Sequence, residues 1–222
     1  MIKLVTCLKR LPELSPEVFQ RYWRTTHAGI VRTLPGICRY VQSHVLRESY
    51  AKGAPVYDGI AEIWVRDTNA VRAFQKTPEM KKLQEDEPKF FQVHASPLII
   101  TEEYPFSERP EKEDAVKVME LITRKKGLPV EDFQAYWLHE HGPMVKRVSD
   151  MRGYVQSHTR LSGYGRIRPP AYDGMSSYWL DDLLGLEDLE RNPEYGTVDS
   201  DRVNFQDVGK TRSIVTREWP IL

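Results

Sequence analysis

One pattern occurs twice in the sequence, and this repeat limits what the chain can fold into. The pattern Phe-Gln-x-Tyr-Trp-x-x-x-His begins at Phe19 and again at Phe133, 114 positions later. The pentapeptide Tyr-Val-Gln-Ser-His begins at Tyr40 and again, unchanged and at the same offset, at Tyr154. The 222 residues therefore contain two copies of one module of about a hundred residues. A residue kept in both diverged copies is a better candidate for fold or chemistry than a residue present once.

Charge and cysteine content narrow the class of protein. The chain has 32 basic and 32 acidic residues, which argues against a nucleic-acid partner because phosphates favour a basic surface. Cys7 and Cys38 have no counterparts in the second copy, so we expect no shared disulfide framework and a cytoplasmic setting. The first apolar stretch is too short for a signal peptide, and no run of about 18 apolar residues occurs, so we expect no membrane partner.

The first copy alternates between strand and helix patterns. Ser15-Pro16-Glu17 is typical of a helix start, and Pro35-Gly36 is typical of its end. Between them, Phe19, Trp23 and His27 share one helix face. The expected strands are 2–9, 40–46, 60–65 and 97–102. The expected helices are 16–34, 68–74 and 78–87.

The second copy repeats this order. The expected strands are 116–124, 154–159, 174–180 and 213–218, and the expected helices are 130–148 and 183–191. The order β-α-β-β-α-β is that of the ferredoxin-like unit. We therefore expect an α+β protein with one ferredoxin-like module at 1–104, a proline-rich and charged linker at 105–114, and a second module at 115–222.

A four-stranded sheet with helices on one face leaves its other face bare. Two such modules packed sheet to sheet would bury both faces. We therefore expect an intramolecular pseudo-dimer that resembles the dimeric α+β barrel. The sequence leaves open whether two chains also form a homodimer.

The paired histidines are the first candidates for chemistry. His27 and His141 each follow a tryptophan by four residues on the helix face that points to the core, where burial and neighbours can shift the pKa. The alternative is a structural histidine bonded to a backbone carbonyl. His94 and His139 lack counterparts, and we expect both at the surface.

A second group lies on one strand of each copy. Tyr40, Gln42 and His44 alternate along the strand and so share a face. Their counterparts are Tyr154, Gln156 and His158. A buried polar group without a partner costs about 1–3 kcal/mol, so this face is solvated, lines a pocket, or consists of structural hydrogen bonders.

A third recurring group precedes the third strand. Tyr57-Asp58-Gly59 returns as Tyr172-Asp173-Gly174. We expect the glycine to allow a tight backbone. The aspartate either caps a turn or orients a histidine or acts as a base. The preceding loops, 47–57 and 160–172, contain glycine and proline and are candidate lids. Their tyrosines, Tyr50 and Tyr164, are candidates to contact an aromatic substrate.

Several common sites are missing from the sequence. Each module offers only two histidines and a carboxylate as paired ligands for a metal ion, which is few. No metal-binding spacing recurs, so we expect no metal. The chain lacks a glycine-rich phosphate loop, a nucleophile elbow and a Cys-x-x-Cys motif, which disfavours nucleotide-dependent transfer and serine hydrolysis.

These motifs resemble those of the EthD family of the dimeric α+β barrel superfamily. The resemblance rests on Phe-x-x-Tyr-Trp-x-x-x-His, Tyr-Val-Gln-Ser-His and Tyr-Asp-Gly, with a later phenylalanine element at Phe90-Phe91 and Phe205. It covers nearly all of both modules, and it departs once, where Pro35-Gly36 becomes Ser149-Asp150. We expect a different turn there.

The resemblance implies a reaction without a cofactor. Related members include a cofactor-free muconolactone methylisomerase, in which a helix histidine and a strand tyrosine are implicated. More distant members bind haem, for which nothing here clearly supplies an axial ligand. Carried over, these roles fall on His27 with Tyr40 and on His141 with Tyr154. With the other recurring polar residues added, the candidate catalytic residues are His27, Tyr40, His44, Asp58, His141, Tyr154, His158 and Asp173. The candidate substrate-binding residues are Trp23, Gln42, Tyr50, Trp137, Gln156 and Tyr164.

The sequence therefore predicts a cofactor-free lyase or isomerase that acts on a small aromatic, lactone or polyketide-like compound in a catabolic pathway. Histidine would act as base or acid, tyrosine would donate to an oxyanion, and aspartate would orient. One alternative is a non-catalytic small-molecule binding or stress-response module. Another is one active and one structural copy, with the first module preferred as the active one because it keeps Pro35-Gly36.

Overall fold

The last residues of the chain belong structurally with its beginning. The computed structural model describes residues 1–51, 53–110, 112, 114–165 and 168–222. Unit 1 consists of Met1–Ile100 with Glu218–Leu222, and unit 2 consists of Thr101–Arg217. The boundaries proposed for modules and linker stay a prediction. Residues 111 and 113 of that linker, and 52 and 166–167 of the two candidate lids, lie outside the described residues.

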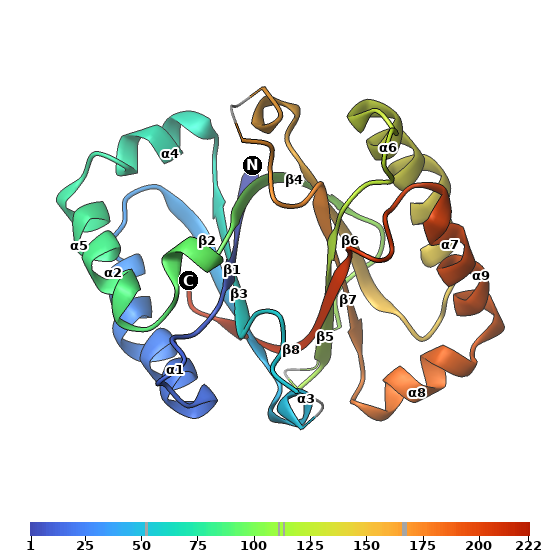
Figure 1. Cartoon of the computed structure of the whole chain (residues 1–222), viewed down its shortest axis with the longest axis horizontal. Coiled ribbons are helices and arrows are strands. Elements are labelled where there is room, and N and C mark those ends of the chain that lie inside the picture. Colours follow the sequence, from blue (N-terminus) through green and yellow to red (C-terminus); the bar gives the residue numbers. More distant parts are fainter. Residues whose placement is uncertain (52, 111, 113, 166–167) are drawn as a thin grey trace. The chain divides into compact units, whose positions relative to one another are not determined.

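In unit 1 a three-stranded antiparallel sheet carries helices on one face (Figure 1). The strand order is β1-β3-β2, and Glu62 lies opposite Val5 on one side and Val41 on the other. The strands are β1 (Ile2–Leu8), β2 (Ile37–Val45) and β3 (Gly59–Val65), followed by β4 (Leu98–Pro105), which continues into unit 2. The helices are α1 (Pro16–Tyr22), α2 (Ala28–Val31), α3 (Arg47–Tyr50), α4 (Thr68–Phe74) and α5 (Pro78–Asp86).

Unit 2 repeats this arrangement with additional strand pairing. Its strand order is β8-β5-β7-β6-β4, antiparallel throughout. The strands are β5 (Val116–Ile122), β6 (Arg152–Thr159), β7 (Gly174–Leu180) and β8 (Arg212–Pro220), and the helices are α6 (Val130–Tyr136), α7 (Gly142–Val145), α8 (Leu184–Arg191) and α9 (Pro193–Asp201). The expected strands are confirmed with small shifts at their ends, and the expected helices are present. The sequence did not predict α3, α9 or the pairing of β4 with β6.

The fold is therefore mixed α+β with antiparallel strands in both units. The ferredoxin-like description of each module and the packing of the modules as a pseudo-dimer stay predictions. Among the described residues, every helix falls short of the length and hydrophobicity that a bilayer-crossing helix needs. Cys7 and Cys38 are both free thiols.

In each unit, a segment from the end of the other sequence copy lies along the second strand. In unit 2, the Phe106 amide donates to the Tyr154 carbonyl at 2.9 Å. In unit 1, the Ile221 amide donates to the Tyr40 carbonyl at 2.8 Å. Phe106 and Ile221 also pack on the core between sheet and helices. Each segment therefore covers the strand that carries the candidate tyrosine.

The first long helix of each unit is interrupted by one π turn, at Trp23–His27 and at Trp137–His141. In the first of these turns the amide of Ala28 donates to the Trp23 carbonyl, five residues back. The sequence spacing predicted a continuous α-helix. A π turn is rare and is frequent at functional sites. Both copies keep it, and both end it at the candidate histidine.

Candidate active site

Each candidate histidine on the helix is held by an aspartate that the sequence did not single out. In unit 1, His27 Nδ1 lies 3.0 Å from Asp86 Oδ2, and the Tyr22 hydroxyl donates to Asp86 Oδ1 at 2.6 Å. In unit 2, His141 Nδ1 lies 2.8 Å from Asp201 Oδ2. The Tyr136 hydroxyl donates to the other oxygen of that carboxylate at 2.6 Å. All four members of the two His–Asp pairs are buried.

The charges of these pairs follow from opposing effects. Burial lowers the pKa of His27 and of His141, while the partner carboxylate raises it, and the net shift is downward. Burial raises the pKa of Asp86, but hydrogen bonds from Tyr22 and His27 outweigh it and lower the pKa. Near neutral pH, a neutral imidazole therefore donates its Nδ1 proton to an ionised carboxylate. The lone pair is then on Nε2, for which no hydrogen bond is found within the described residues.

A second network fills the space between helix and sheet. Trp23 Nε1 donates to the Tyr40 hydroxyl at 3.0 Å, and the Gln42 side-chain amide donates to the same hydroxyl at 2.8 Å and to the Trp23 carbonyl at 2.9 Å. His44 Nε2 lies 2.9 Å from Gln42 Oε1. Since this oxygen can only accept, His44 carries its proton on Nε2. The expected polar face is therefore buried and hydrogen-bonded, which matches the structural alternative.

The same network occurs in unit 2 with nearly the same distances. Trp137 Nε1 donates to the Tyr154 hydroxyl at 3.1 Å, and His158 Nε2 lies 2.8 Å from Gln156 Oε1. The turn after the helix does differ, as expected, because Gly36 has a φ of +81° and Asp150 does not have a positive φ. That difference leaves the network unchanged.

Burial sets the protonation of the network. Burial lowers the pKa of His44 to about 3, helped by the nearby charge of Arg24, and it lowers the pKa of His158 to about 3 as well. These histidines are neutral near pH 7. Burial also raises the pKa of Tyr40 and Tyr154. Tyr40 is only 1% exposed, so a substrate does not reach its hydroxyl in this conformation.

The recurring glycine leaves room for the tryptophan ring. A Cβ added at Gly59 would lie 2.4 Å from the Trp23 ring, and one added at Gly174 would lie 2.5 Å from the Trp137 ring. Neither glycine has a positive φ. The backbone is tight through close approach rather than through a left-handed conformation, since the added Cβ would also lie 3.0 Å from the Ser43 carbonyl oxygen at Gly59 and 2.7 Å from that of Ser157 at Gly174.

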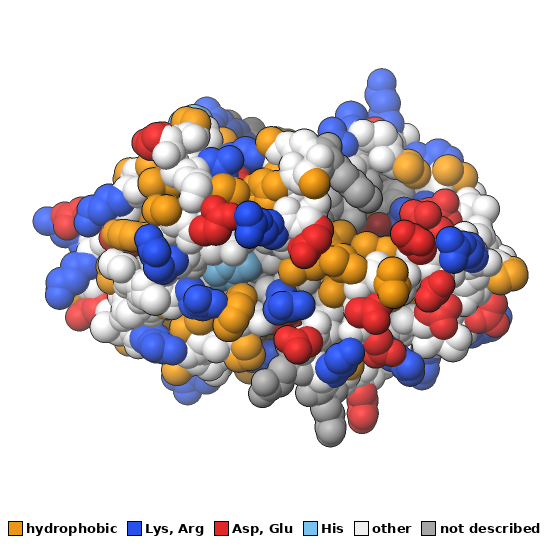
Figure 2. Space-filling view, turned by 90° about the horizontal axis from the view of Figure 1, so that it is seen from below, with side chains coloured by type: hydrophobic (Ala, Val, Ile, Leu, Met, Phe, Trp, Pro, Cys, Tyr) orange, Lys and Arg blue, Asp and Glu red, His pale blue; other side chains and the backbone are white. Residues whose placement is uncertain are grey.

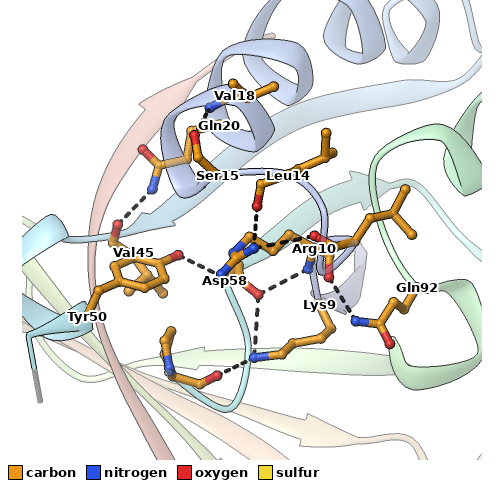
Figure 3. A network of polar contacts seen from close by, with 12 residues as sticks. Lys9, Arg10, Leu14, Ser15, Val18, Gln20, Val45, Tyr50, Asp58 and Gln92 are labelled. Carbon is orange, nitrogen blue, oxygen red and sulfur yellow. Dashed lines mark hydrogen bonds and ion pairs between the residues drawn. The ribbon is translucent and has the colours of Figure 1, made fainter. Parts of the chain in front are cut away.

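The recurring aspartate before this glycine holds an arginine. Asp58 accepts from the backbone amide and Nε of Arg10 at 3.0 Å each and from the Tyr50 hydroxyl at 2.9 Å, and Lys9 Nζ lies 3.6 Å away (Figure 3). Asp173 binds Arg124 and Tyr164 in the same way. Within the described residues, no hydrogen bond joins either aspartate to a histidine, so these contacts do not support the alternative in which the aspartate orients a histidine. Tyr50 and Tyr164 likewise hold the carboxylate.

A shallow cavity of about 470 Å³, wide open to solvent, lies beside the network in unit 2. Its walls include Tyr104, Phe106, Leu138, His139 and Pro143. The Tyr104 ring meets the His158 ring edge-on, with 4.8 Å between centroids. The cavity therefore lies against the helical segment that carries His141 and next to the ring that covers His158.

Unit 1 has different side chains at the corresponding positions. Trp219 lies in the place of Tyr104, and the planes of the Trp219 and His44 rings are inclined by 68° with 6.2 Å between centroids. The Arg24 guanidinium, in the place of Leu138, stacks 4.2 Å above the Trp219 ring. This cation–π pair covers the network of unit 1 where unit 2 has a cavity wall.

The structure thus separates the candidates into three groups per unit. His27 is hydrogen-bonded to Asp86, the strand residues are hydrogen-bonded to Trp23, and Asp58 is hydrogen-bonded to Arg10. No hydrogen bond links His27 to Tyr40 within the described residues. The missed aspartates did leave a signal, since Asp86-x-x-x-Phe90 recurs as Asp201-x-x-x-Phe205.

The remaining expectations concern the surface and metals. His94 and His139 are exposed, as expected. The described residues include no group of three or more histidine, cysteine, aspartate or glutamate side chains suited to a metal ion. Figure 2 shows basic and acidic side chains interspersed over one face.

Comparisons with known proteins agree with the fold. The structure of an anthrone oxidase-like protein is similar, with 13% sequence identity and a TM-score of 0.68 over 99% of this chain and 92% of that one. A mutant chlorite dismutase from Candidatus Nitrospira defluvii is 9% identical, with a TM-score of 0.59 over 99% of this chain and 92% of that one. At such low identity these matches show a shared fold and nothing about the reaction. None of the curated proteins matches the sequence.

The family match covers both copies of the repeat. The EthD domain matches residues 11–94 and again residues 125–209. These ranges contain both His–Asp pairs, both Trp–Tyr–Gln–His networks and both aspartates that hold arginine. The chain therefore belongs to the EthD domain family, with two copies of the domain in tandem.

Proposed function

We propose that the chain is a cofactor-independent acid–base enzyme, a lyase or isomerase, that acts on a small aromatic, lactone or polyketide-like compound in a catabolic pathway. The observation that carries this proposal is the buried His–Asp pair present in both units. A carboxylate that accepts the Nδ1 proton fixes the tautomer and leaves Nε2 as a general base. A lowered histidine pKa keeps that base unprotonated near neutral pH.

The reaction would be proton abstraction next to a carbonyl. Nε2 of His27 or His141 would remove a proton from carbon, and Asp86 or Asp201 would stabilise the imidazolium that forms. Return of the proton to another carbon gives an isomer, whereas loss of a leaving group gives a lyase product. General acid–base catalysis typically contributes about 10²–10⁴-fold to a rate.

The cavity of unit 2 supports the substrate class. Its volume of about 470 Å³ is in the range of small-molecule sites, and Tyr104, Phe106, Leu138 and Pro143 give it aromatic and apolar walls. Such walls suit an aromatic or lactone ring. Because Arg24 and Trp219 occupy the matching region of unit 1, we favour unit 2 as the active copy, in contrast to the sequence-based preference for the first module.

The two structural neighbours carry names that refer to different chemistries, so the shared fold does not choose a reaction. Catalytic roles for Tyr40, Tyr154, His44 and His158 stay predictions. In the present conformation these side chains are buried and hold the tryptophans. The absence of a cofactor from the reaction and the cytoplasmic location also stay predictions.

Hydrogen–deuterium exchange tests this proposal without knowledge of the product. Aromatic ketones and unsaturated lactones would be incubated with the protein in D₂O, and loss of the acidic C–H signal followed by NMR. We expect exchange with at least one compound, and its loss in the double variant His27→Gln/His141→Gln. His94→Gln is the matched control, since His94 is exposed and takes no part in the hydrogen bonds of either His–Asp pair. Exchange that survives in the double variant contradicts the assignment of the base.

A binding function without chemistry is the second candidate. It is favoured by the strand residues, whose polar atoms are bonded to one another beneath Trp23 and Trp137. On this alternative, compounds of the same panel bind, as detected by calorimetry, but the wild-type protein exchanges none of their protons.

A further inference from the structure

Asp58 and Asp173 are held alike except for one partner. Each carboxylate accepts from an arginine amide and Nε and from a tyrosine hydroxyl. In unit 1 the Lys9 ammonium is an additional partner, 3.6 Å from Asp58 Oδ2, and it also donates to the Pro55 carbonyl (Figure 3). The Asp58 side chain is 1% exposed, whereas that of Asp173 is 12% exposed.

Thr123 takes the place of Lys9 in unit 2. The Lys9 carbonyl accepts from the Gln92 amide at 2.8 Å, and the Thr123 carbonyl accepts from the Asp207 amide at 2.8 Å. Each residue directly precedes the arginine that binds the aspartate. The two positions are therefore equivalent in backbone pairing. The threonine, however, is short and has no ammonium group to pair with the carboxylate.

A cavity of about 310 Å³ is lined by both Thr123 and Asp173, the counterparts of Lys9 and Asp58. Thr123, Arg124, Tyr164 and Asp173 form part of its wall, together with Pro169 and Pro170. Pro170 precedes Asp173 by three residues, as Pro55 precedes Asp58. The cavity thus contains Asp173, the counterpart of the carboxylate that binds an ammonium group in unit 1. It also contains Pro170, the counterpart of the proline whose carbonyl is the second acceptor in unit 1.

We infer that this cavity of unit 2 is a binding site for a small molecule with a primary alkylammonium group. The ligand ammonium binds Asp173 and the carbonyl of Pro170, as Lys9 binds Asp58 and the carbonyl of Pro55. The alkyl chain lies over Thr123, along the path of the lysine side chain in unit 1. This site is separate from the His–Asp pair and does not depend on the function proposed above.

The cations around the cavity are compatible with this ligand. Arg124 is already bonded to Asp173, and Lys210 lies 3.2 Å from Asp207, the carboxylate that replaces Gln92. Lys125 and Lys126 are exposed at the rim, where water screens their charge. Unit 1 shows that one carboxylate can hold an arginine and an ammonium group together.

An NMR titration of the full chain with n-butylammonium chloride tests the inference. At constant ionic strength, we expect saturable shifts of the Thr123, Gly127 and Tyr164 amides, with an affinity in the millimolar range. Thr123→Lys supplies the tethered ammonium of unit 1 and should weaken binding at least about tenfold. Lys9→Thr should create a second site, seen as new saturable shifts at Arg10 and Tyr50.

The controls separate this site from general attraction of charge. Tetramethylammonium chloride has the charge but no N–H donor and should bind at least about tenfold more weakly. Equal binding of tetramethylammonium, stronger binding of sodium butyrate, or unchanged binding in Thr123→Lys each overturns the inference. The gain of a site in Lys9→Thr decides the matter if Thr123→Lys does not fold.

Discussion

The two units share a buried hydrogen-bond network, here called the centre. They differ in the side chains that lie over this network, here called the cover. Each unit has the same tryptophan, tyrosine, glutamine and histidine network, with distances that agree closely. The cover differs, since Trp219 and Arg24 in unit 1 correspond to Tyr104 and Leu138 in unit 2. A duplicated chain can keep the interior that both copies need for folding while one cover changes. The centre alone is therefore weak evidence for activity, and our proposal that unit 2 is the active copy rests on the cover.

The largest expected effect is on catalysis and tests the inequality of the two units. Asp201→Asn should reduce the proton-exchange rate by roughly 10²-fold or more, because the amide no longer fixes the tautomer of His141. The reduction in Asp86→Asn should be smaller, because Arg24 and Trp219 cover that unit. Asp199→Asn, two residues from Asp201 and exposed, is the control. Equal losses in Asp86→Asn and Asp201→Asn would show that the cover does not decide activity.

Acid unfolding tests the equality of the two centres. The folded-state pKa of about 3 for His44 and His158 lies below the unfolded value of about 6.5, so the unfolded state binds more protons below that pH. Their contribution to stability is complete above pH 6.5. It is lost as the pH falls toward about 3, at about 1.4 kcal/mol per pH unit for each histidine.

The measurement is urea unfolding between pH 7.5 and pH 4.5. His44→Gln and His158→Gln should each remove an equal part of the pH dependence, whatever they do to stability at neutral pH. His94→Gln should leave the slope unchanged, since His94 is exposed. A slope that the double variant retains would mean that these histidines are protonated in the folded protein.

The repeat explains how much of this arrangement could be predicted. Motifs that recur with several identical residues identified His27, Tyr40 and Asp58 and their counterparts as candidates. Strand and helix periodicity placed these residues on or beside the correct elements. Asp86 and Asp201 were missed because only the aspartate and one phenylalanine recur there. Helix α9 was missed although Asn192-Pro193-Glu194 matches the start Thr77-Pro78-Glu79.

Other features lie beyond local sequence signals. The π turns have the apolar spacing of an ordinary helix, so periodicity cannot reveal them. A strand pattern does not name its partner, and the pairing of β4 with β6 therefore could not be predicted. The role of Gly59 depends on the indole of Trp23, which is remote in sequence. In each case a tertiary contact decides what local propensity leaves open.

The glycines beneath the tryptophans give the next effect in size. Gly59→Ala and Gly174→Ala should each destabilise the fold by about 1–3 kcal/mol, because the added methyl group meets a buried indole ring. The two losses should be similar, since the centres are alike. Gly29→Ala meets nothing within 4 Å on a helix and should instead stabilise by up to about 1 kcal/mol. Urea unfolding followed by tryptophan fluorescence measures all three, and a neutral Gly174→Ala would show that the indole has room to move.

The smallest effect concerns the packing of the cover. A Cβ at Gly142 would lie 2.1 Å from the Phe106 ring, whereas unit 1 has Ala28 and the smaller Ile221 at these positions. Gly142→Ala should therefore cost about 1 kcal/mol after its gain in helix propensity, and Phe106→Ile a similar amount through lost packing. The double variant recreates the pair of unit 1 and should be more stable than the sum of the single changes predicts. Additive losses would show that the two positions do not compensate one another, and that the covers of the two units differ by more than an exchange of side-chain volume.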